Sequence, residues 1–426
     1  MDTIRAIKGM LDISSEEVAT WQFIEKTFAQ IAAQYGYKET RFPIVESTNL
    51  FKRSIGEVTD IVEKEMYTFS DRNDGSLTLR PEGTACCARS LIQAGKVGER
   101  YQHKLWYAGP MFRYEKPQKG RQRQFHQIGM ESFGFSDAQA DAELLLLTHR
   151  LWKALGIADV VKLELNTIGT VDERNAYKAA LQAFLQDKAD LLDEDSKRRL
   201  NTNPLRILDS KIESTQALLV GAPVLTDFLG DETKAHFARL TGILDSAGLA
   251  YELNTSLVRG LDYYNYTVFE WTTTKLGAQG TVCAGGRYDK LVEQLGGKST
   301  PGVGFAMGLE RLVLLLESVN AEKVESLQSV PDACVVAVGD EAQLAAFKLL
   351  EHLRDVYPSK RFEMVLTGGS FKSQMKKVDK SGAEIALIIG ESEASQSVVG
   401  VKWLRDREQA QQTLSYGAVV SLIKEL

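Results

Sequence analysis

The stretch from Phe112 to Glu131, FRYEKPQKGRQRQFHQIGME, concentrates charged and amide side chains in one predicted hairpin. Its pattern predicts strands over 104–115 and 122–133, joined by a Pro- and Gly-containing loop at 116–121. Successive side chains of a strand point to opposite faces, so odd-numbered residues share one surface. These include Arg123, Gln127 and Glu131 on the second strand, with Arg121 immediately before it, and the first strand adds Arg113 and Glu115. Such a face is either solvated or built around a polar ligand, and charge alone leaves both possibilities open.

A second polar group precedes this hairpin, in the segment TLRPEGT at 78–84. Arg80 stands before Pro81, which disfavours helical geometry, so 81–84 is predicted to join a strand to a helix. Glu82 and Thr84 would present a carboxylate and a hydroxyl at that junction. Helix N-termini favour the same residue types, so capping is the simpler explanation from these residues alone.

Three downstream segments complete the pattern: LVRGLDYY at 257–264, AGGRYD at 284–289 and GFAMGLER at 304–311. Residues 302–306 predict a strand that opens onto a helix at Met307, which places Arg311 in the early turns. A guanidinium fixed there can bind a triphosphate through paired hydrogen bonds. The glycines form neither a GxGxxG fingerprint nor a Walker A loop, so a dinucleotide fold and a P-loop are not supported.

These segments together resemble the class II aminoacyl-tRNA synthetases and, among them, the histidyl-tRNA synthetase family. FRYE at 112–115 matches the FRxE pattern of class II motif 2, and GFAMGLER resembles motif 3. LVRGLDYY and AGGRYD resemble the two signature segments of the histidyl family, and TLRPEGT matches its counterpart residue for residue. The segments follow the family's order, and the resemblance covers essentially the whole chain.

The resemblance implies ATP-dependent activation of L-histidine to histidyl-adenylate, with Mg²⁺ accompanying ATP, and transfer to the 3′ end of tRNA(His). It implies that Arg113 and Arg259 are the catalytic residues. The implied histidine-binding set is Glu82, Thr84, Arg113, Gln127, Glu131, Arg259, Tyr263 and Tyr264. The implied ATP-binding set is Arg113, Glu115, Arg121 and Arg311, and the residues expected to contact the tRNA acceptor end are Gln118 and Lys119.

Two alternatives of other classes compete with this interpretation. A non-catalytic paralogue that regulates ATP phosphoribosyltransferase in histidine biosynthesis keeps the fold but typically loses the arginine signature and the C-terminal domain. This chain retains Arg259, Arg311 and a full C-terminal module. A tRNA-binding module without catalysis is disfavoured because Glu82 and Gln127 are intact.

Length and composition set outer limits on the fold and its location. With 426 residues, 44% hydrophobic and 25% charged, the chain is expected to form two or three globular domains. We expect a cytoplasmic protein, because no apolar run reaches membrane-spanning length and the N-terminus lacks a signal-peptide core. Its four cysteines and five histidines lack metal-ligand spacing, so no protein-only metal site is predicted.

The formal net charge of −6 argues weakly against indiscriminate binding of nucleic acid, although a local basic patch can still bind RNA. The hairpin loop supplies one such patch. A second is the triplet Lys197, Arg198 and Arg199, which could contact RNA phosphates but is more simply a solvated helix face.

The periodicity predicts three regions. Residues 1–170 and 250–320 form an α+β catalytic domain, for which the class II resemblance implies a central antiparallel sheet. Residues 171–249 read as a charged helical insertion, and 331–426 alternate as an α/β domain with a mostly parallel mixed sheet. The last resembles the family's anticodon-binding domain.

The N-terminus predicts a helix that Ser14 and Glu17 cap and Gly36 ends, followed by a strand over 37–45 containing Pro43. Since proline lacks a backbone donor, that strand is expected at an edge or an interface. A long helix followed by such a strand resembles class II motif 1, which implies a homodimer.

Overall fold

The computed structural model describes residues 3–56, 59, 61–202, 204–208, 210, 212–257, 263–277, 280–406 and 408–425. Contacts divide the chain into two units, Met1–Leu327 and Gln328–Leu426, and each has its own apolar core. Within these described ranges, no helix combines the length and the apolar character needed to cross a membrane.

The predicted hairpin is the centre of the first unit. Strands β5 (His103–Phe112) and β6 (Gln124–Phe133) pair antiparallel from His103 opposite Phe133 to Phe112 opposite Gln124. The sheet continues on both sides in the order β1 (Lys38–Glu39), β5, β6, β11 (Gly302–Gly308), β10 (Thr281–Arg287), β9 (Asn265–Thr272), β7 (Lys162–Thr167), β8 (Glu252–Leu253). The inner pairs are antiparallel and the outermost pairs, β1–β5 and β7–β8, are parallel. The central antiparallel sheet is therefore confirmed.

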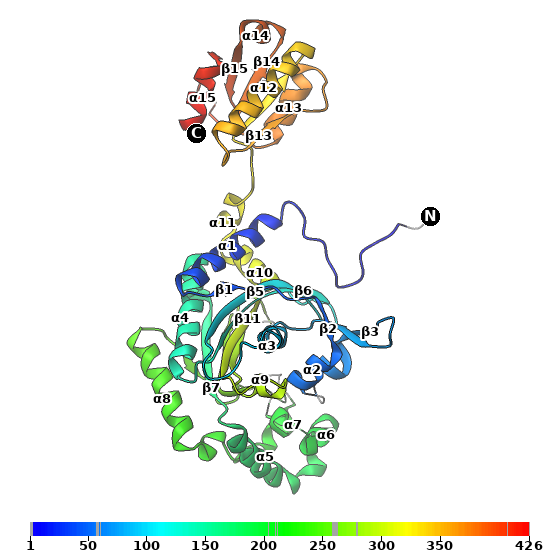
Figure 1. Ribbon diagram of the computed structural model, residues 1–426, viewed down its shortest axis with the longest axis vertical. Helices are drawn as coiled ribbons and strands as arrows, with labels where there is room; N and C mark the ends of the chain where they lie inside the picture. The colour runs from blue at the N-terminus through cyan, green and yellow to red at the C-terminus, as the bar shows by residue number, and fades with distance from the viewer. Residues whose placement is uncertain are drawn as a thin grey trace. The chain divides into compact units, whose positions relative to one another are not determined.

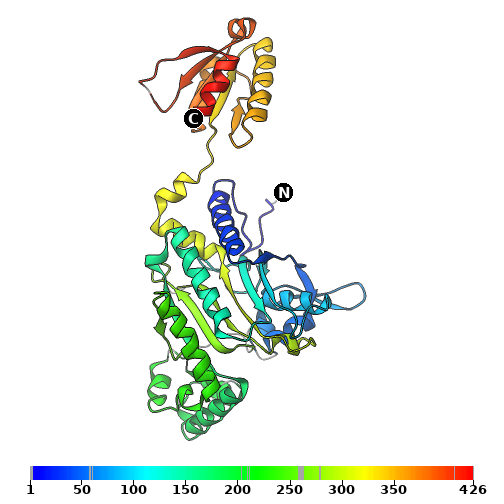
Figure 2. The same ribbon diagram turned by 60° about the vertical axis from the view of Figure 1, so that its left-hand side comes forward.

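One face of this sheet is covered by helices (Figures 1 and 2). Even-numbered β6 residues such as Ile128 and Met130 are fully buried in a core shared with these helices. The helices are α1 (Val18–Gln34), α4 (Ala138–Leu155), α8 (Asp231–Ser246) and α10 (Leu309–Val319). Because strand side chains alternate, the odd-numbered β6 residues face the other way.

The opposite face carries smaller elements. A three-stranded sheet is formed in the order β2 (Val45–Ser47), β4 (Ser76–Leu79) and β3 (Tyr67–Ser70). Nearby lie the helices α2 (Thr48–Ile55), α3 (Thr84–Gln93) and α9 (Leu291–Gln294). A turn joins β3 to β4, with Asp71 N donating to Gly75 O at 2.9 Å. The predicted strand-to-helix junction at 81–84 also lies where expected, between β4 and α3.

The N-terminal expectations are met in part. Ser14 and Glu17 form the reciprocal capping contacts, Ser14 N to Glu17 Oε2 at 3.0 Å and Glu17 N to Ser14 Oγ at 3.3 Å. The single strand predicted over 37–45 is wrong, because β1 and β2 belong to different sheets and Pro43 lies between them. Arg80 binds the backbone carbonyl groups on either side of Pro43: its Nη1 donates to Phe42 O and its backbone N donates to Ile44 O.

The charged segment after β7 is helical. Helices α5 (Val171–Gln186), α6 (Glu194–Thr202) and α7 (Glu213–Leu218) contribute to a separate apolar cluster that includes Leu181 and Leu200. Helix α8 instead packs on α4, with Leu240 and Leu244 in the main core. On α6, Lys197 and Arg198 pair with acidic residues three positions earlier, which fits a solvated face.

The second unit contains a mixed sheet in the order β13 (Phe362–Met364), β12 (Ala333–Ala337), β14 (Ile385–Ile389), β15 (Val398–Trp403), β16 (Gln412–Ser415). Strands β13, β12 and β14 are parallel to one another. Strand β15 is antiparallel to β14, and β16 is antiparallel to β15. Helices pack on both faces: α12 (Asp340–Val356), α13 (Phe371–Lys380), α14 (Glu391–Gln396) and α15 (Tyr416–Glu425). The predicted α/β alternation is confirmed, although the patterns missed α14 and β16. Helix α11 (Ala321–Ser326) precedes this unit.

Candidate active site

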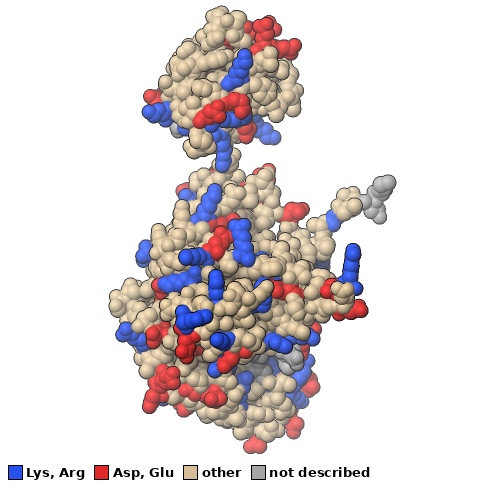
Figure 3. Space-filling model, in the orientation of Figure 1, with Lys and Arg blue, Asp and Glu red and all other residues tan. Residues whose placement is uncertain are grey.

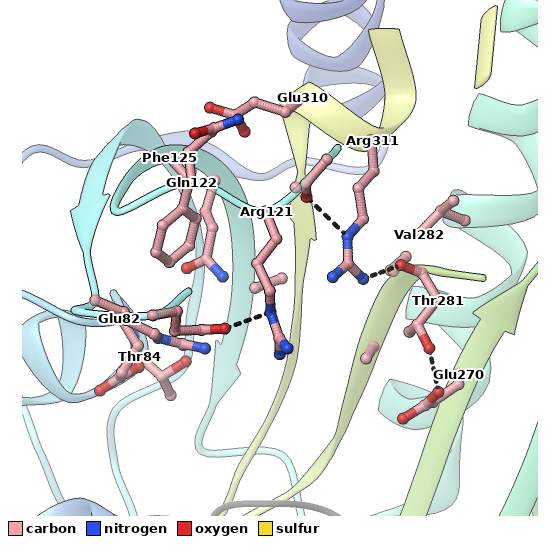
Figure 4. A pocket seen from close by; sticks show the side chains of 18 of the residues that line it. Glu82, Thr84, Arg121, Gln122, Phe125, Glu270, Thr281, Val282, Glu310 and Arg311 are labelled. Atoms are coloured by element: carbon pink, nitrogen blue, oxygen red, sulfur yellow. Dashed lines mark hydrogen bonds and ion pairs between the residues drawn. The ribbon is translucent and has the colours of Figure 1, made fainter. Parts of the chain in front are cut away.

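A cavity of about 350 Å³ opens on the odd-numbered face of β6. It brings together side chains from the β4–α3 junction, the hairpin, the segment before β9 and the first turn of α10 (Figure 4). The predicted site residues that line it are Glu82, Thr84, Arg113, Glu115, Arg121, Gln127, Tyr263, Tyr264 and Arg311. Arg259 lies outside the described residues.

Glu82 both caps α3 and lines the cavity. Its carboxylate accepts from Thr84 N at 2.6 Å and from Ala85 N at 3.0 Å, as expected for an acceptor at a helix N-terminus. Burial raises the pKa of Glu82. The next residue, Gly83, packs closely against Tyr107, because a Cβ on Gly83 would stand 2.2 Å from the Tyr107 ring. The capping explanation and the binding explanation are therefore compatible in one residue.

Gln127 presents an unused acceptor to the cavity. Its Oε1 is buried and has no hydrogen-bond partner among the described residues. Leaving a buried carbonyl oxygen without a donor costs about 1–3 kcal/mol, so such an atom is expected to have a ligand partner. A cationic ammonium group would satisfy it.

Glu131 lies behind the cavity wall and is fully buried. Its Oε1 accepts from the Thr84 hydroxyl at 2.8 Å and the Tyr107 hydroxyl at 3.0 Å, and its Oε2 accepts from the Tyr288 hydroxyl. Burial raises the pKa of Glu131 to about 8 despite these three donors. The carboxylate is thus held in one orientation by neighbours on α3, on β5 and just after β10.

An aromatic cluster connects Glu131 to the cavity. The Tyr288 ring centroid lies 5.7 Å from that of Tyr263 and 6.3 Å from that of Tyr264, and these two tyrosines line the cavity. Sequence reasoning assigned no role to Tyr107 or Tyr288. Strand parity could have indicated Tyr107, which is an odd-numbered β5 residue opposite Gly129. Tyr288 lies within the AGGRYD segment.

Three guanidinium groups, those of Arg113, Arg121 and Arg311, line the cavity. Arg311 Nη1 donates to Thr281 O at 2.6 Å and its Nε to Gly120 O at 3.3 Å, and burial lowers its pKa. Arg121 forms an ion pair with Glu115, and both it and Arg311 enter the cavity in Figure 4. Arg113 Nε donates to Pro81 O at 2.9 Å. Three guanidinium groups therefore face one cavity.

Other polar residues of the hairpin point elsewhere. The Arg123 guanidinium lies 3.7 Å over the Tyr114 ring, away from the cavity surface that strand parity predicted for it. Gln118 and Lys119 are exposed at the hairpin tip. Alternation fails for Arg123 because β6 begins only at Gln124.

The AGGRYD segment has a structural explanation. A Cβ on Gly285 would stand 2.2 Å from Gly304 O, and one on Gly286 would stand 2.4 Å from Thr267 O, so the glycines allow close approach of neighbouring strands. Arg287 is fully buried and forms ion pairs with Asp141 on α4 and with Asp289. Its ion pair with Asp141 connects the end of β10 to α4.

Two carboxylates lie near Arg311 in the cavity: Glu115, which pairs with Arg121, and Glu270, which accepts from the Thr281 hydroxyl at 2.7 Å. Carboxylate oxygens are suitable ligands for Mg²⁺ when phosphate oxygens supply the remainder, so these residues fit a nucleotide-bound cation. Within the part of the chain that the structure describes, no three His, Cys, Asp or Glu side chains gather closely enough to hold a metal themselves. All four cysteines are buried.

Charge on the molecular surface is mixed. In the view of Figure 3, Lys and Arg side chains are interspersed with Asp and Glu.

Comparison with known proteins assigns the family. A family model for histidyl-tRNA synthetase matches residues 9–312, and a model for an anticodon binding domain matches residues 332–426. The crystal structure of apo histidyl-tRNA synthetase from S. aureus is 36% identical, with a TM-score of 0.82, and the match covers 99% of this chain and 100% of that chain.

Two more distant structures share the fold. A histidyl-tRNA synthetase from Nostoc sp. PCC 7120 is 17% identical with a TM-score of 0.69, covering 99% of each chain. An ATP phosphoribosyltransferase regulatory subunit/histidyl-tRNA synthetase from Bacillus halodurans C is 20% identical with a TM-score of 0.64, covering 92% of this chain and 99% of that one. The family model over residues 9–312 and the full-length S. aureus match establish that the chain belongs to the histidyl-tRNA synthetase family of class II histidine–tRNA ligases.

Proposed function

We propose that this chain activates L-histidine with ATP to form histidyl-adenylate and then transfers the histidyl group to the 3′ end of tRNA(His). The observation that carries the proposal is the convergence, in one cavity, of three guanidinium groups with the acceptors Glu82 and Gln127. In the first step a carboxylate oxygen of histidine attacks the α-phosphorus and pyrophosphate leaves. In the second a ribose hydroxyl of the tRNA attacks the acyl carbon and AMP leaves.

The arginines would act by position and charge. Attack of a carboxylate on a triphosphate joins two anions, and negative charge grows as pyrophosphate departs, so guanidinium groups already in place lower the barrier. We assign Arg113, with Arg259, to the histidine carboxylate and the α-phosphate. Arg121 and Arg311 would hold the outer phosphates, with Glu115 orienting Arg121.

The acceptors would select histidine. Glu82, Thr84 and Gln127 would bind its α-ammonium group, for which the unpartnered Gln127 oxygen is the strongest support. Tyr263, Tyr264 and Glu131 would recognise the imidazole, with Glu131 acting from behind the wall through the tyrosine cluster. A site that hydrogen-bonds both ring nitrogens discriminates by roughly 10⁴-fold or more against side chains that cannot do so.

Mg²⁺ would enter with ATP, held by phosphate oxygens together with Glu115 and Glu270, and would shield phosphate charge. Gln118 and Lys119 would contact the acceptor end of the tRNA. We further propose that 1–170 and 250–320 form the catalytic domain, 171–249 the helical insertion and 331–426 the anticodon-binding domain. The working form would be a cytoplasmic homodimer.

The regulatory paralogue remains the competing function, because one structural neighbour carries that name together with the synthetase name. The intact cavity and the match to an anticodon binding domain favour the ligase.

ATP–pyrophosphate exchange by the purified protein tests the proposal directly. Exchange should require L-histidine and should respond weakly to other amino acids. Absence of histidine-dependent exchange, with folded protein and Mg²⁺ present, would favour the regulatory alternative.

A further inference from the structure

Strand β6 has a backbone donor that the sheet itself leaves without a partner. The last residue pair between β6 and β11 is Gln127 with Gly308, after which the chain turns into α10 at Leu309. On the other side His126 stands opposite Pro110. The His126 N–H therefore lies where β11 has already left the sheet, and a partly buried amide needs an acceptor.

Glu310 supplies that acceptor. His126 N donates to both carboxylate oxygens, at 2.9 Å to Oε1 and 3.1 Å to Oε2. His126 Nδ1 lies 3.1 Å from the same Oε1, and both side chains are largely buried, 24% and 17% exposed. The Trp21 ring from α1 meets the imidazole edge-on, with ring centroids 5.1 Å apart. The Glu310 carboxylate on α10 thus accepts the hydrogen bond that a neighbouring strand would otherwise accept.

This contact fixes the turn that carries Arg311. Glu310 and Arg311 are adjacent in the first turn of α10, so anchoring Glu310 to β6 limits rotation and sliding of that turn. Arg311 in turn holds Gly120 O of the hairpin loop and Thr281 O of β10. Glu310 also lines the cavity, and engagement with His126 restrains a carboxylate that could otherwise turn towards incoming phosphates.

We propose that Glu310 and His126 form a positioning pair that sets where the Arg311 guanidinium meets the outer phosphates of ATP. The inference rests on the proposed function and names no new substrate. Neither residue was assigned a role by the sequence motifs. Because the pair acts through Arg311, its loss should weaken use of ATP and leave use of histidine nearly unchanged.

The test compares Glu310→Ala and Glu310→Gln in histidine-dependent ATP–pyrophosphate exchange. Glu310→Ala should raise KM for ATP by about tenfold or more, since small displacements of a binding group are costly, while KM for histidine changes less than about twofold. Glu310→Gln keeps an oxygen for the His126 N–H and should restore most of the loss. Glu317→Ala, which removes an exposed carboxylate from the same helix, is the matched control.

A double-mutant cycle establishes whether the pair works through Arg311. If it does, adding Glu310→Ala to Arg311→Ala should change KM for ATP little beyond the effect of Arg311→Ala alone. Independent, multiplying effects would overturn the proposal, as would an unchanged KM for ATP in Glu310→Ala. Equal losses in Glu310→Gln and Glu310→Ala, reversed by more Mg²⁺, would show that Glu310 binds the cation instead.

Two further measurements keep the outcome decisive. Thermal unfolding of each variant verifies the fold. If Glu310→Ala does not fold, His126→Ala takes its place as the test. This variant keeps the contact between the backbone N–H and Glu310, so its rise in KM for ATP should be smaller than the one expected for Glu310→Ala. An unchanged KM for ATP in folded His126→Ala would then count against the pair. Loss of exchange in the unmodified protein would refute the proposed function, whereas normal exchange with an unchanged KM for ATP in Glu310→Ala would refute only this inference.

Discussion

Gln127 and Glu131 are four residues apart on the same face of β6, yet their surroundings differ. Glu131 is surrounded by three hydroxyl donors, whereas the Gln127 oxygen has no partner among the described residues. A satisfied group orients its neighbours, and an unsatisfied one offers binding energy to a ligand. We therefore assign direct ammonium contact to Gln127 and a supporting role to Glu131.

Gln127→Ala should raise KM for histidine by about 10- to 100-fold, because a hydrogen bond to a charged group contributes about 1.5–3 kcal/mol. KM for ATP should change much less. Pyrophosphate exchange at varied histidine concentration measures the effect. Gln124→Ala, on the opposite face of the same strand, is the control, and an equal rise in that variant would contradict the assignment.

Glu131 should make stability depend on pH. Its pKa rises from 4.5 to about 8 on folding, so the native state binds more protons than the unfolded state between these values. Its contribution is fully present below 4.5 and is lost as pH rises through about 8, with a slope of at most about 1.4 kcal/mol per pH unit.

Glu131→Gln should remove this slope, which denaturant unfolding across the same pH window would measure. Glu317→Gln, at an exposed position, should retain it. Parallel pH profiles for Glu131→Gln and the unmodified protein would disprove the assignment.

At the scale of elements, the buried ion pair of Arg287 with Asp141 joins β10 to α4. Burial alone would raise the pKa of Asp141, but the Arg287 guanidinium and His236 bring it below its usual value. Arg287 also donates to Phe135 O and Asp137 O at the start of α4. The strand and the helix are thereby held in one alignment, which supports the tyrosine cluster next to Arg287.

Asp141→Asn should destabilise the protein by about 3–5 kcal/mol, because the buried Arg287 guanidinium loses its fully buried counter-charge and keeps only the partly exposed Asp289. Urea unfolding measures this loss. The double variant Asp141→Leu with Arg287→Met removes both charges and should recover much of it. A single variant as stable as the unmodified protein would show that the pair is not needed for folding.

At the scale of the whole molecule, each unit has its own apolar core, so each has the means to fold by itself. The cavity is built entirely from residues of the first unit. The match to an anticodon binding domain concerns the second. Adenylate formation and tRNA recognition should therefore be separable.

Truncation after Leu327 should leave histidine-dependent pyrophosphate exchange within a few-fold of the full chain. Charging of tRNA should fall by about 100-fold or more, since an RNA contact surface worth several kcal/mol is removed. Both assays should use the same protein preparation, with unfolding curves to verify the fold. Equal losses in the two reactions would contradict the separation.

The sequence alone determined most of the elements and their order, apart from α14, β16 and the division of 37–45 between two sheets. The Ser14–Glu17 cap, the β5–β6 hairpin, the junction before α3 and the alternation of the second unit were all predictable, because caps, turns and periodicity depend on nearby residues. The family motifs also named most of the charged residues that line the cavity, but they did not indicate that Glu131 lies behind its wall. The family resemblance to histidyl-tRNA synthetases was likewise visible in the sequence and is confirmed.

Only the tertiary structure decided how individual polar groups are satisfied. Local alternation put Arg123 on the cavity face, but it lies over Tyr114, and a single strand was predicted where Pro43 separates two sheets. The burial of Arg287 against Asp141 and the support of Arg311 by Glu310 were not predictable. These pairings join residues far apart in the chain, so burial and hydrogen-bond geometry set them, and neither quantity exists before the strands and helices have packed.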